Sequence, residues 1–168
     1  MNFKKTLLAL AVTAASGVAL ADINIGVILP LTGPASGLGI PAKNQMALWP
    51  TSIAGEKLNV TILDDATDPT NGVKNARRYV TEDKVDLIVG SVATPVGVAI
   101  AEVALETKTP QLALTPIGLP PGKDAYSFRM PQSNGVMATA IVGHMQKQGI
   151  KTVGFLGYTD AYGEQWLQ

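Results

Sequence analysis

The fold is decided by the stretch Val85-Asp86-Leu87-Ile88-Val89-Gly90-Ser91-Val92-Ala93-Thr94-Pro95. Its first part, residues 85–89, is short and nearly continuous in apolar residues, which is typical of a strand buried in a parallel sheet. Thr94 and Pro95 favour the first turn of a helix, because proline there lacks only an N–H group that the helix leaves unpaired. The stretch therefore predicts a strand, a short loop that carries hydroxyl groups and a helix, in immediate succession.

The same succession repeats along the rest of the chain. Further short apolar runs with the strand pattern cover residues 23–29, 58–63, 111–114 and 152–156. Residues 126–130 fit either another strand or a crossing segment. Helix-length intervals separate these runs, and strands that alternate with helices indicate an α/β fold with a parallel sheet.

Two of the predicted helices are marked by their own residues. Asp68 is a good N-cap and Pro69 follows it at the first helical position, so a helix is predicted from there to about Glu82. A second helix is predicted over residues 134–148. The apolar spacing predicts that this helix buries Val136, Ala140, Ile141, Val142 and Met145.

The N-terminus has the pattern of a secretory signal peptide at residues 1–21. Lys4 and Lys5 precede a short apolar core, and Ala19 and Ala21 form a small-x-small cleavage site. The core is too short for a membrane anchor, which needs about 20 apolar residues. Because the chain has no cysteine, no lipidated cysteine follows the cleavage point. We expect cleavage after Ala21 and a free, soluble periplasmic product.

The composition excludes several classes of function. A chain without cysteine forms no disulfide, zinc-thiolate site or cysteine nucleophile. Without the two lysines of the signal peptide, the chain has 11 basic and 13 acidic residues and a net charge of −2. This charge argues against nucleic-acid binding. Asp64 and Asp65 are interpreted as the solvated end of a strand, and His144 is the only histidine. No nucleophile elbow or metal-ligand spacing occurs, so we expect no metal, no cofactor and no enzymatic activity.

A candidate ligand site lies in the loop that follows residues 85–89. Ser91, Ala93 and Thr94 place hydroxyl and amide groups between the end of a strand and the start of a helix, where open α/β sheets bind ligands. A helix N-terminus carries partial positive charge and unpaired N–H donors, so the expected guest is a carboxylate. The alternative is that Thr94 simply caps the helix.

Taken together, the motifs resemble those of periplasmic solute-binding proteins of the branched-chain amino-acid ABC transporter type, which have the type I binding-protein fold. The matching stretches, in chain order, are Ile25-Gly26-Val27, Leu31-Thr32-Gly33-Pro34, Asp64-Asp65, Asp68-Pro69-Thr70, Lys84-Val85-Asp86-Leu87-Ile88-Val89-Gly90, Phe128-Arg129 and Thr159-Asp160-Ala161-Tyr162-Gly163-Glu164. The resemblance implies two α/β lobes that close on a ligand. Residues 22–131 are then a first lobe without its return segment, and residues 132–168 are the truncated start of a second.

The resemblance also implies which residues bind the ligand. The family's carboxylate-binding hydroxyl falls on Thr94, and its next backbone donor falls on Thr115. A family threonine and a family tyrosine are replaced here by Ile117 and Leu38, whereas a second-lobe tyrosine is kept as Tyr162. The wall of the site is therefore expected to be more apolar than in amino-acid binders. Branched-chain amino acids and aromatic or aliphatic carboxylates both remain open as ligands.

The function that the resemblance implies is that of the substrate-binding component of an ABC importer. We expect a monomer that delivers a small carboxylate or amino acid to a membrane permease. The alternative is a sensory module that uses the same fold to regulate a partner. The present chain, expressed alone, is expected to be poorly stable and not to bind ligand with the family's affinity.

Overall fold

The computed structural model describes residues 22–167, so the predicted signal peptide lies outside the described residues. A six-stranded sheet has the order β2-β3-β1-β4-β5-β6, and all neighbouring strands are parallel except the hairpin pair β2 and β3. The strands are β1 (Ile23–Leu29), β2 (Ser52–Ile53), β3 (Glu56–Asp64), β4 (Leu87–Gly90), β5 (Gln111–Ala113) and β6 (Ser127–Arg129). The predicted α/β fold with a parallel sheet is confirmed.

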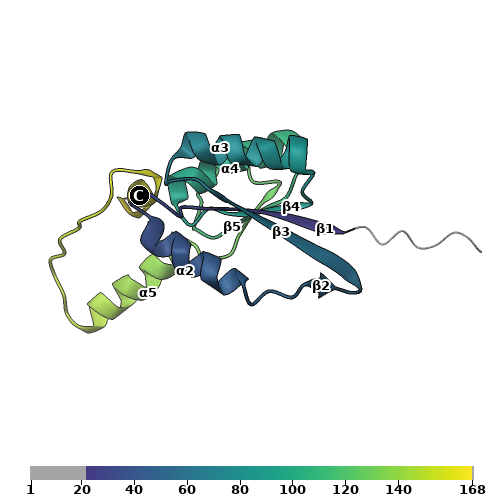
Figure 1. Cartoon of the computed structure of the whole chain (residues 1–168). Helices are drawn as coiled ribbons and strands as arrows, with labels where there is room; N and C mark the ends of the chain where they lie inside the picture. The colour runs from purple at the N-terminus through teal and green to yellow at the C-terminus, as the bar shows by residue number, and fades with distance from the viewer. Residues whose placement is uncertain (1–21, 168) are drawn as a thin grey trace, which may run out of the picture.

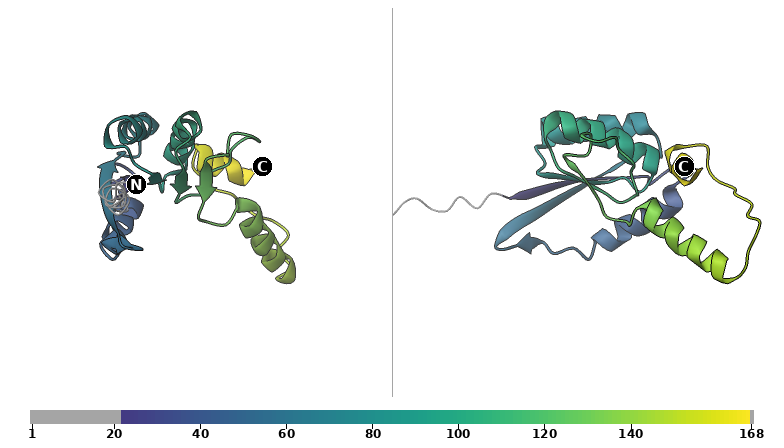
Figure 2. Two further views of the ribbon diagram at one scale, coloured as in Figure 1. Left: turned by 90° about the vertical axis from the view of Figure 1, so that its right-hand side faces the viewer. Right: turned by 180° about the vertical axis from the view of Figure 1, so that it is seen from behind.

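Helices cover both faces of the sheet (Figure 1). Helices α3 and α4 lie together over one face and α2 lies over the other, while α5 points away from the sheet in each view (Figure 2). The helices are α2 (Ser36–Met46), α3 (Pro69–Arg78) with the π-helical turn η1 (Tyr79–Asp83), α4 (Thr94–Thr107), α5 (Asn134–Lys147) and α6 (Ala161–Leu167).

The core forms on the two sides of β1, because successive side chains of a strand point to opposite faces. Ile28 packs with Ile88 and with Val96 and Ile100 of α4 on one side. On the other side, Val27 belongs to a cluster that α2 covers through Ala42 and Met46. Covering both faces requires apolar residues at nearly every strand position, which is the pattern that the sequence shows.

The start of α3 is confirmed at the predicted residue. Asp68 Oδ1 accepts hydrogen bonds from the backbone N–H groups of Thr70 at 2.6 Å and Asn71 at 3.2 Å, and Pro69 occupies the first turn. The helix places Tyr79 at its C-terminal end, where the side chain is fully buried. The Tyr79 hydroxyl lies 2.8 Å from the carbonyl oxygen of Val27 and 2.7 Å from that of Thr61, between β1 and β3. This contact fixes α3 on the sheet.

Two predictions for the C-terminal part are wrong. Helix α5 forms where expected, but none of its residues is buried, since no described element covers its apolar face. Residues 152–156 form no strand, because no other described segment pairs with them. Both features need a packing or pairing partner, which residues 22–167 do not supply.

Candidate functional site

The order of the strands places a topological switch point at β1. The chain runs from β1 outward to β3 and then returns to β4 on the opposite side of β1. Open parallel sheets bind ligands outside the carboxyl ends of their strands at such a switch point. The loops that follow β1, β4 and β5 meet at this end, and they carry most of the predicted site residues.

Thr94 and Thr115 lie in contact at this end of the sheet. Thr94 is the first residue of α4 and Thr115 follows β5, and each is only 3% exposed. Their Oγ1 atoms lie 2.5 Å apart, so one hydroxyl donates a hydrogen bond to the other. Two hydroxyl groups hold two hydrogen atoms and this bond uses one of them. The pair therefore keeps one O–H group that can donate to a further acceptor.

Helix α4 begins without a capping side chain. Ala93 occupies the N-cap position, and no side chain accepts a hydrogen bond from the first turn. The alternative prediction that Thr94 simply caps the helix is therefore wrong, because Thr94 lies one position inside it. Uncapped N–H groups at a helix start carry partial positive charge and are a favourable environment for an anion.

Ser91 and Ala93 direct their polar groups into the protein. Ser91 Oγ donates to Asp65 Oδ2 at 2.7 Å and accepts from the backbone N–H of Ala93 at 3.2 Å. All three residues are buried. The hydroxyl group of Ser91 and the N–H group of Ala93 thus already have acceptors within the protein. Their hydrogen bonds connect the residue before α4 to Asp65.

The interpretation of Asp64 and Asp65 as a solvated strand end is wrong. Asp65 is 0% exposed, and it accepts hydrogen bonds from Ser91 and from the backbone N–H of Thr67 at 2.8 Å. Burial raises the pKa of the Asp65 carboxyl group, and these two hydrogen bonds oppose that rise. No residue near the pair in the sequence indicates this burial, because Ser91, the side-chain partner of Asp65, lies 26 positions along the chain.

Asp64 holds the loop that follows β1. Its Oδ1 accepts from the N–H groups of Leu31 at 2.8 Å, Thr32 at 3.2 Å and Ala66 at 2.8 Å, and its Oδ2 accepts from Thr32 Oγ1 at 2.6 Å. Partial burial favours a higher pKa for the Asp64 carboxyl group. The hydrogen bonds from Thr32, Ala66 and Leu31 outweigh burial, so the pKa lies below its usual range.

The other predicted site residues occupy separate parts of the structure. Leu38 lies on α2 and is 61% exposed, whereas Ile117 is 1% exposed and packs with Ala101 and Ala113. Tyr162 lies on α6, and its ring makes an edge-to-face contact with Trp166 at 6.3 Å between centroids. Among the described residues, no hydrogen bond or hydrophobic cluster joins Leu38, Ile117 and Tyr162.

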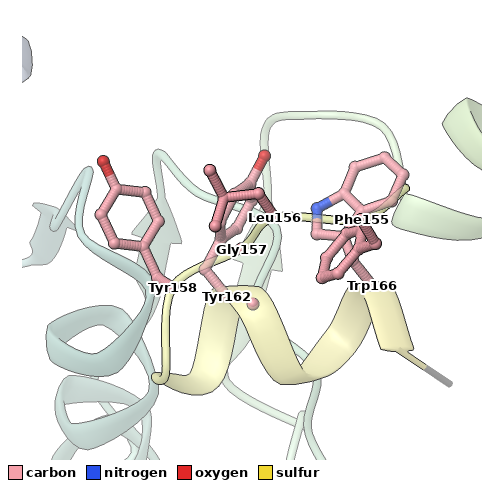
Figure 3. A pocket seen from close by; sticks show the side chains of 7 residues that line it. Phe155, Leu156, Gly157, Tyr158, Tyr162 and Trp166 are labelled. Atoms are coloured by element: carbon pink, nitrogen blue, oxygen red, sulfur yellow. The ribbon is translucent and has the colours of Figure 1, made fainter.

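A cavity of about 550 Å³ lies against one face of α6 (Figure 3). Figure 3 shows the side chains of Tyr162 and Trp166 on one side of α6 with Phe155 near Trp166, while Tyr158 lies apart near the start of the helix. The cavity is lined by none of the buried hydroxyl groups at the start of α4. The polar part of the candidate site and the aromatic part around Tyr162 are therefore distinct regions of the described chain.

Other kinds of site have little support. Within residues 22–167, no group of three or more His, Cys, Asp or Glu side chains is arranged to hold a metal ion. None of the described helices combines the length and the apolar character needed to cross a membrane.

The family model for periplasmic binding proteins matches residues 22–168. The Leu/Ile/Val-binding protein homolog 3 of Brucella melitensis is 32% identical to the chain over 160 residues, which are 87% of this chain and 42% of that protein. An extracellular ligand-binding receptor from Rhodopseudomonas palustris HaA2 is 42% identical in its solved structure, with a TM-score of 0.85, and the match covers 88% of this chain and 41% of that one.

A further solved structure shows a bound ligand. It is the solute-binding protein of an ABC transporter from Rhodopseudomonas palustris BisB5 in complex with 3,4-dihydroxybenzoic acid, 28% identical with a TM-score of 0.79, and the match covers 87% of this chain and 42% of that one.

These matches confirm the fold and the family inferred from the sequence motifs. The chain spans about two fifths of the length of these relatives, 41–42% in each case. All three are named as binding proteins or receptors, and the prediction that the chain is not an enzyme is confirmed. The chain belongs to the family of periplasmic binding proteins.

Proposed function

We propose that the complete protein carrying this chain is the substrate-binding component of an ABC importer. It captures a small carboxylate, either a branched-chain amino acid or a related small acid, between two lobes and delivers it to a membrane permease. The observation that carries this proposal is the buried hydroxyl pair of Thr94 and Thr115, with one O–H group to spare, at the uncapped start of α4.

The geometry supports a carboxylate as the group that is recognised. A carboxylate accepts several hydrogen bonds, and bonds to a charged acceptor are stronger than neutral ones. In the proposed complex, the ligand carboxylate accepts from the Thr94 hydroxyl and from the backbone N–H groups of Thr94 and Thr115.

Apolar residues complete the proposed site around the carboxylate. Leu38 supplies exposed apolar surface on α2. Ile117 lies close to Thr115 at Gly97 of α4, since a Cβ placed on Gly97 would lie 3.0 Å from Cγ2 of both residues. Tyr162, on the segment assigned to the second lobe, covers the ligand when the lobes close, by the hinge motion typical of periplasmic binding proteins.

The relatives support the same chemistry. One is named for leucine, isoleucine and valine, and another was solved with 3,4-dihydroxybenzoic acid. These ligands differ in charge, size and aromatic character, and the group that they share is the carboxylate. A site whose donors converge on a carboxylate, with a variable apolar wall, accounts for both.

The domain limits and the location of the protein are part of the proposal. Residues 22–131 form the first lobe and residues 132–168 begin the second, which agrees with a sheet that ends at β6 and a helix α5 that buries no residue on it. Residues 1–21 direct export and are cleaved after Ala21, so that the mature protein acts in the periplasm as a monomer. Membership of the periplasmic binding protein family supports this location.

Isothermal titration of the complete protein tests the function. The ligands are L-leucine, L-valine and 3,4-dihydroxybenzoate, each paired with its methyl ester, which keeps the shape and removes the negative charge. We expect at least one of the acids to bind and its ester to lose most of the affinity. Equal binding of acid and ester would show that the carboxylate is not the recognised group.

A further inference from the structure

A chain of hydrogen bonds, buried on the side of Ser91 and partly buried on the side of Thr67, joins two of the loops at the candidate site. Asp65 lies at its centre, where Oδ2 accepts from Ser91 Oγ at 2.7 Å and Oδ1 accepts from the N–H of Thr67 at 2.8 Å. On one side, Ser91 accepts from the N–H of Ala93, directly before α4. On the other side, Thr67 Oγ1 accepts from the N–H of Ala35, directly before α2, at 3.0 Å. The starts of both helices are therefore linked through one carboxylate.

We propose that Asp65 is a positioning residue, which holds the loops after β1 and β4 at a fixed spacing and so presents Thr94 to the ligand. Asp65 does not contact the ligand itself, because both of its oxygen atoms are engaged within the protein and the residue is 0% exposed. The proposal rests on the proposed function for the ligand and for the role of Thr94, whereas the linkage of the loops rests on the hydrogen bonds of Asp65 alone.

The linkage requires a carboxylate and not merely a polar side chain of the same size. Asp65 receives one donor on each oxygen, from Ser91 and from Thr67. An asparagine offers one oxygen and one NH₂ group, so one of these two donors would face another donor. If the NH₂ group faces Ser91, the serine oxygen receives two donors and its own hydroxyl hydrogen loses its acceptor.

Water does not readily replace the lost link. Asp65 and Ser91 are both 0% exposed, and a buried donor left without an acceptor is costly. The loop before α4 then has to shift for its groups to find new partners. Because Thr94 follows this loop directly, a shift there moves the hydroxyl group and the N–H groups that are proposed to bind the ligand.

The test uses five variants of the complete protein: two single changes in the network, their double variant, the site variant Thr94→Val and one matched control. Asp65→Asn breaks the centre of the chain of hydrogen bonds without changing the volume, and Ser91→Ala breaks only the branch toward α4. Asp68→Asn is the control, because it makes the same chemical change three positions away in an exposed helix cap where asparagine serves as well as aspartate. Amide hydrogen exchange is measured without ligand, and affinity is measured by calorimetry with L-leucine and 3,4-dihydroxybenzoate.

The expected exchange pattern follows the connections of the network. Asp65→Asn accelerates exchange of the Ala35, Thr67 and Ala93 amides, Ser91→Ala accelerates that of Ala93 alone, and Asp68→Asn changes none of them. Unchanged exchange of Ala35 and Ala93 in Asp65→Asn overturns the proposal, whether or not either acid binds.

The affinity measurements separate positioning from general destabilisation. We expect the Asp65→Asn and Ser91→Ala changes each to lower the affinity for the ligand by roughly tenfold. The double variant should bind the ligand no more weakly than Asp65→Asn alone, because both changes act through the hydrogen bond between Asp65 and Ser91. If the losses of binding free energy in the two single variants add in the double variant, the two residues do not act through this shared hydrogen bond. If Thr94→Val weakens binding but Asp65→Asn does not, the positioning role is wrong and the site stands. If Thr94→Val has no effect or neither acid binds, the proposed function fails, and the exchange data alone decide on Asp65.

Discussion

Thr94→Val tests the carboxylate site most directly. Valine has nearly the shape of threonine, so the change removes one hydroxyl group from a position that is 3% exposed and leaves the packing in place. The ligand loses a hydrogen bond between a hydroxyl donor and a charged acceptor, which contributes about 1.5–3 kcal/mol. At 25 °C this corresponds to a dissociation constant raised by roughly 10- to 150-fold.

The neighbouring hydroxyl group supplies a second part of the prediction. Thr115 loses its partner in the Thr94→Val variant, and this neutral hydrogen bond contributes about 1 kcal/mol to folding. Thr115→Val also breaks the bond between the two hydroxyls, but it keeps the backbone N–H group that is proposed to contact the ligand. We therefore expect similar losses of stability for the two variants and a clearly smaller loss of affinity for Thr115→Val.

Calorimetry on the complete protein, with thermal unfolding in parallel, provides the measurement. Thr94→Ser keeps the hydroxyl group and is the control, so its affinity should stay within a fewfold of the original. An affinity that Thr94→Val leaves unchanged would refute the assignment of Thr94 to the carboxylate. A larger loss for Thr115→Val than for Thr94→Val would show instead that Thr115 carries the donating hydroxyl.

Three further predictions concern stability. Tyr79→Phe removes a buried hydroxyl that bridges β1 and β3 and should lower the free energy of unfolding by about 0.5–1.5 kcal/mol, as measured by urea denaturation. Gly72→Ala would place its Cβ 2.5 Å from Cγ1 of the fully buried Val96. This overpacking should cost about 1–3 kcal/mol of stability, which outweighs the gain in helix propensity. In Gly143→Ala the added Cβ meets open space, so this control variant should not be destabilised. Because the pKa of Asp64 is lowered in the folded state from its ordinary 3.8, its contribution to stability is present above that value and is lost as the pH falls through the lowered pKa. Urea midpoints at pH 6 and pH 3 should therefore differ less in Asp64→Asn than in the original protein, and an equal pH dependence would contradict this role of Asp64.

The framework of the fold could be predicted because each element is marked by nearby residues. The apolar run that became β1 has the predicted bounds, Ile23–Leu29, and α4 begins at the predicted Thr94. The cap at Asp68 lies within three residues of the N–H groups that it binds. Short-range signals of this kind depend on steric and hydrogen-bonding preferences that hold in any context.

The features that were missed depend on contacts between distant segments. The partner of Asp65 lies 26 positions away, so nothing next to the aspartate pair indicates that one carboxylate is buried. The burial of α5 was predicted from the spacing of its apolar residues, but burial requires a surface that covers them, and the described residues provide none. A pattern of residues thus predicts what a segment can bury or bind, and only the surrounding structure decides whether it does.

The same distinction separates the residues of the site. Ser91, Ala93 and Thr94 are equivalent in the sequence, since each places a donor near the start of the same helix. In the structure, Ser91 donates to Asp65 and Ala93 donates to Ser91, and both bonds are complete without a ligand. Of these three residues, only Thr94 belongs to a hydroxyl pair, with Thr115, that holds a hydrogen beyond the one that its own bond requires. A ligand carboxylate is therefore expected at Thr94, and we propose that Ser91 and Ala93 contribute by holding Thr94 in place.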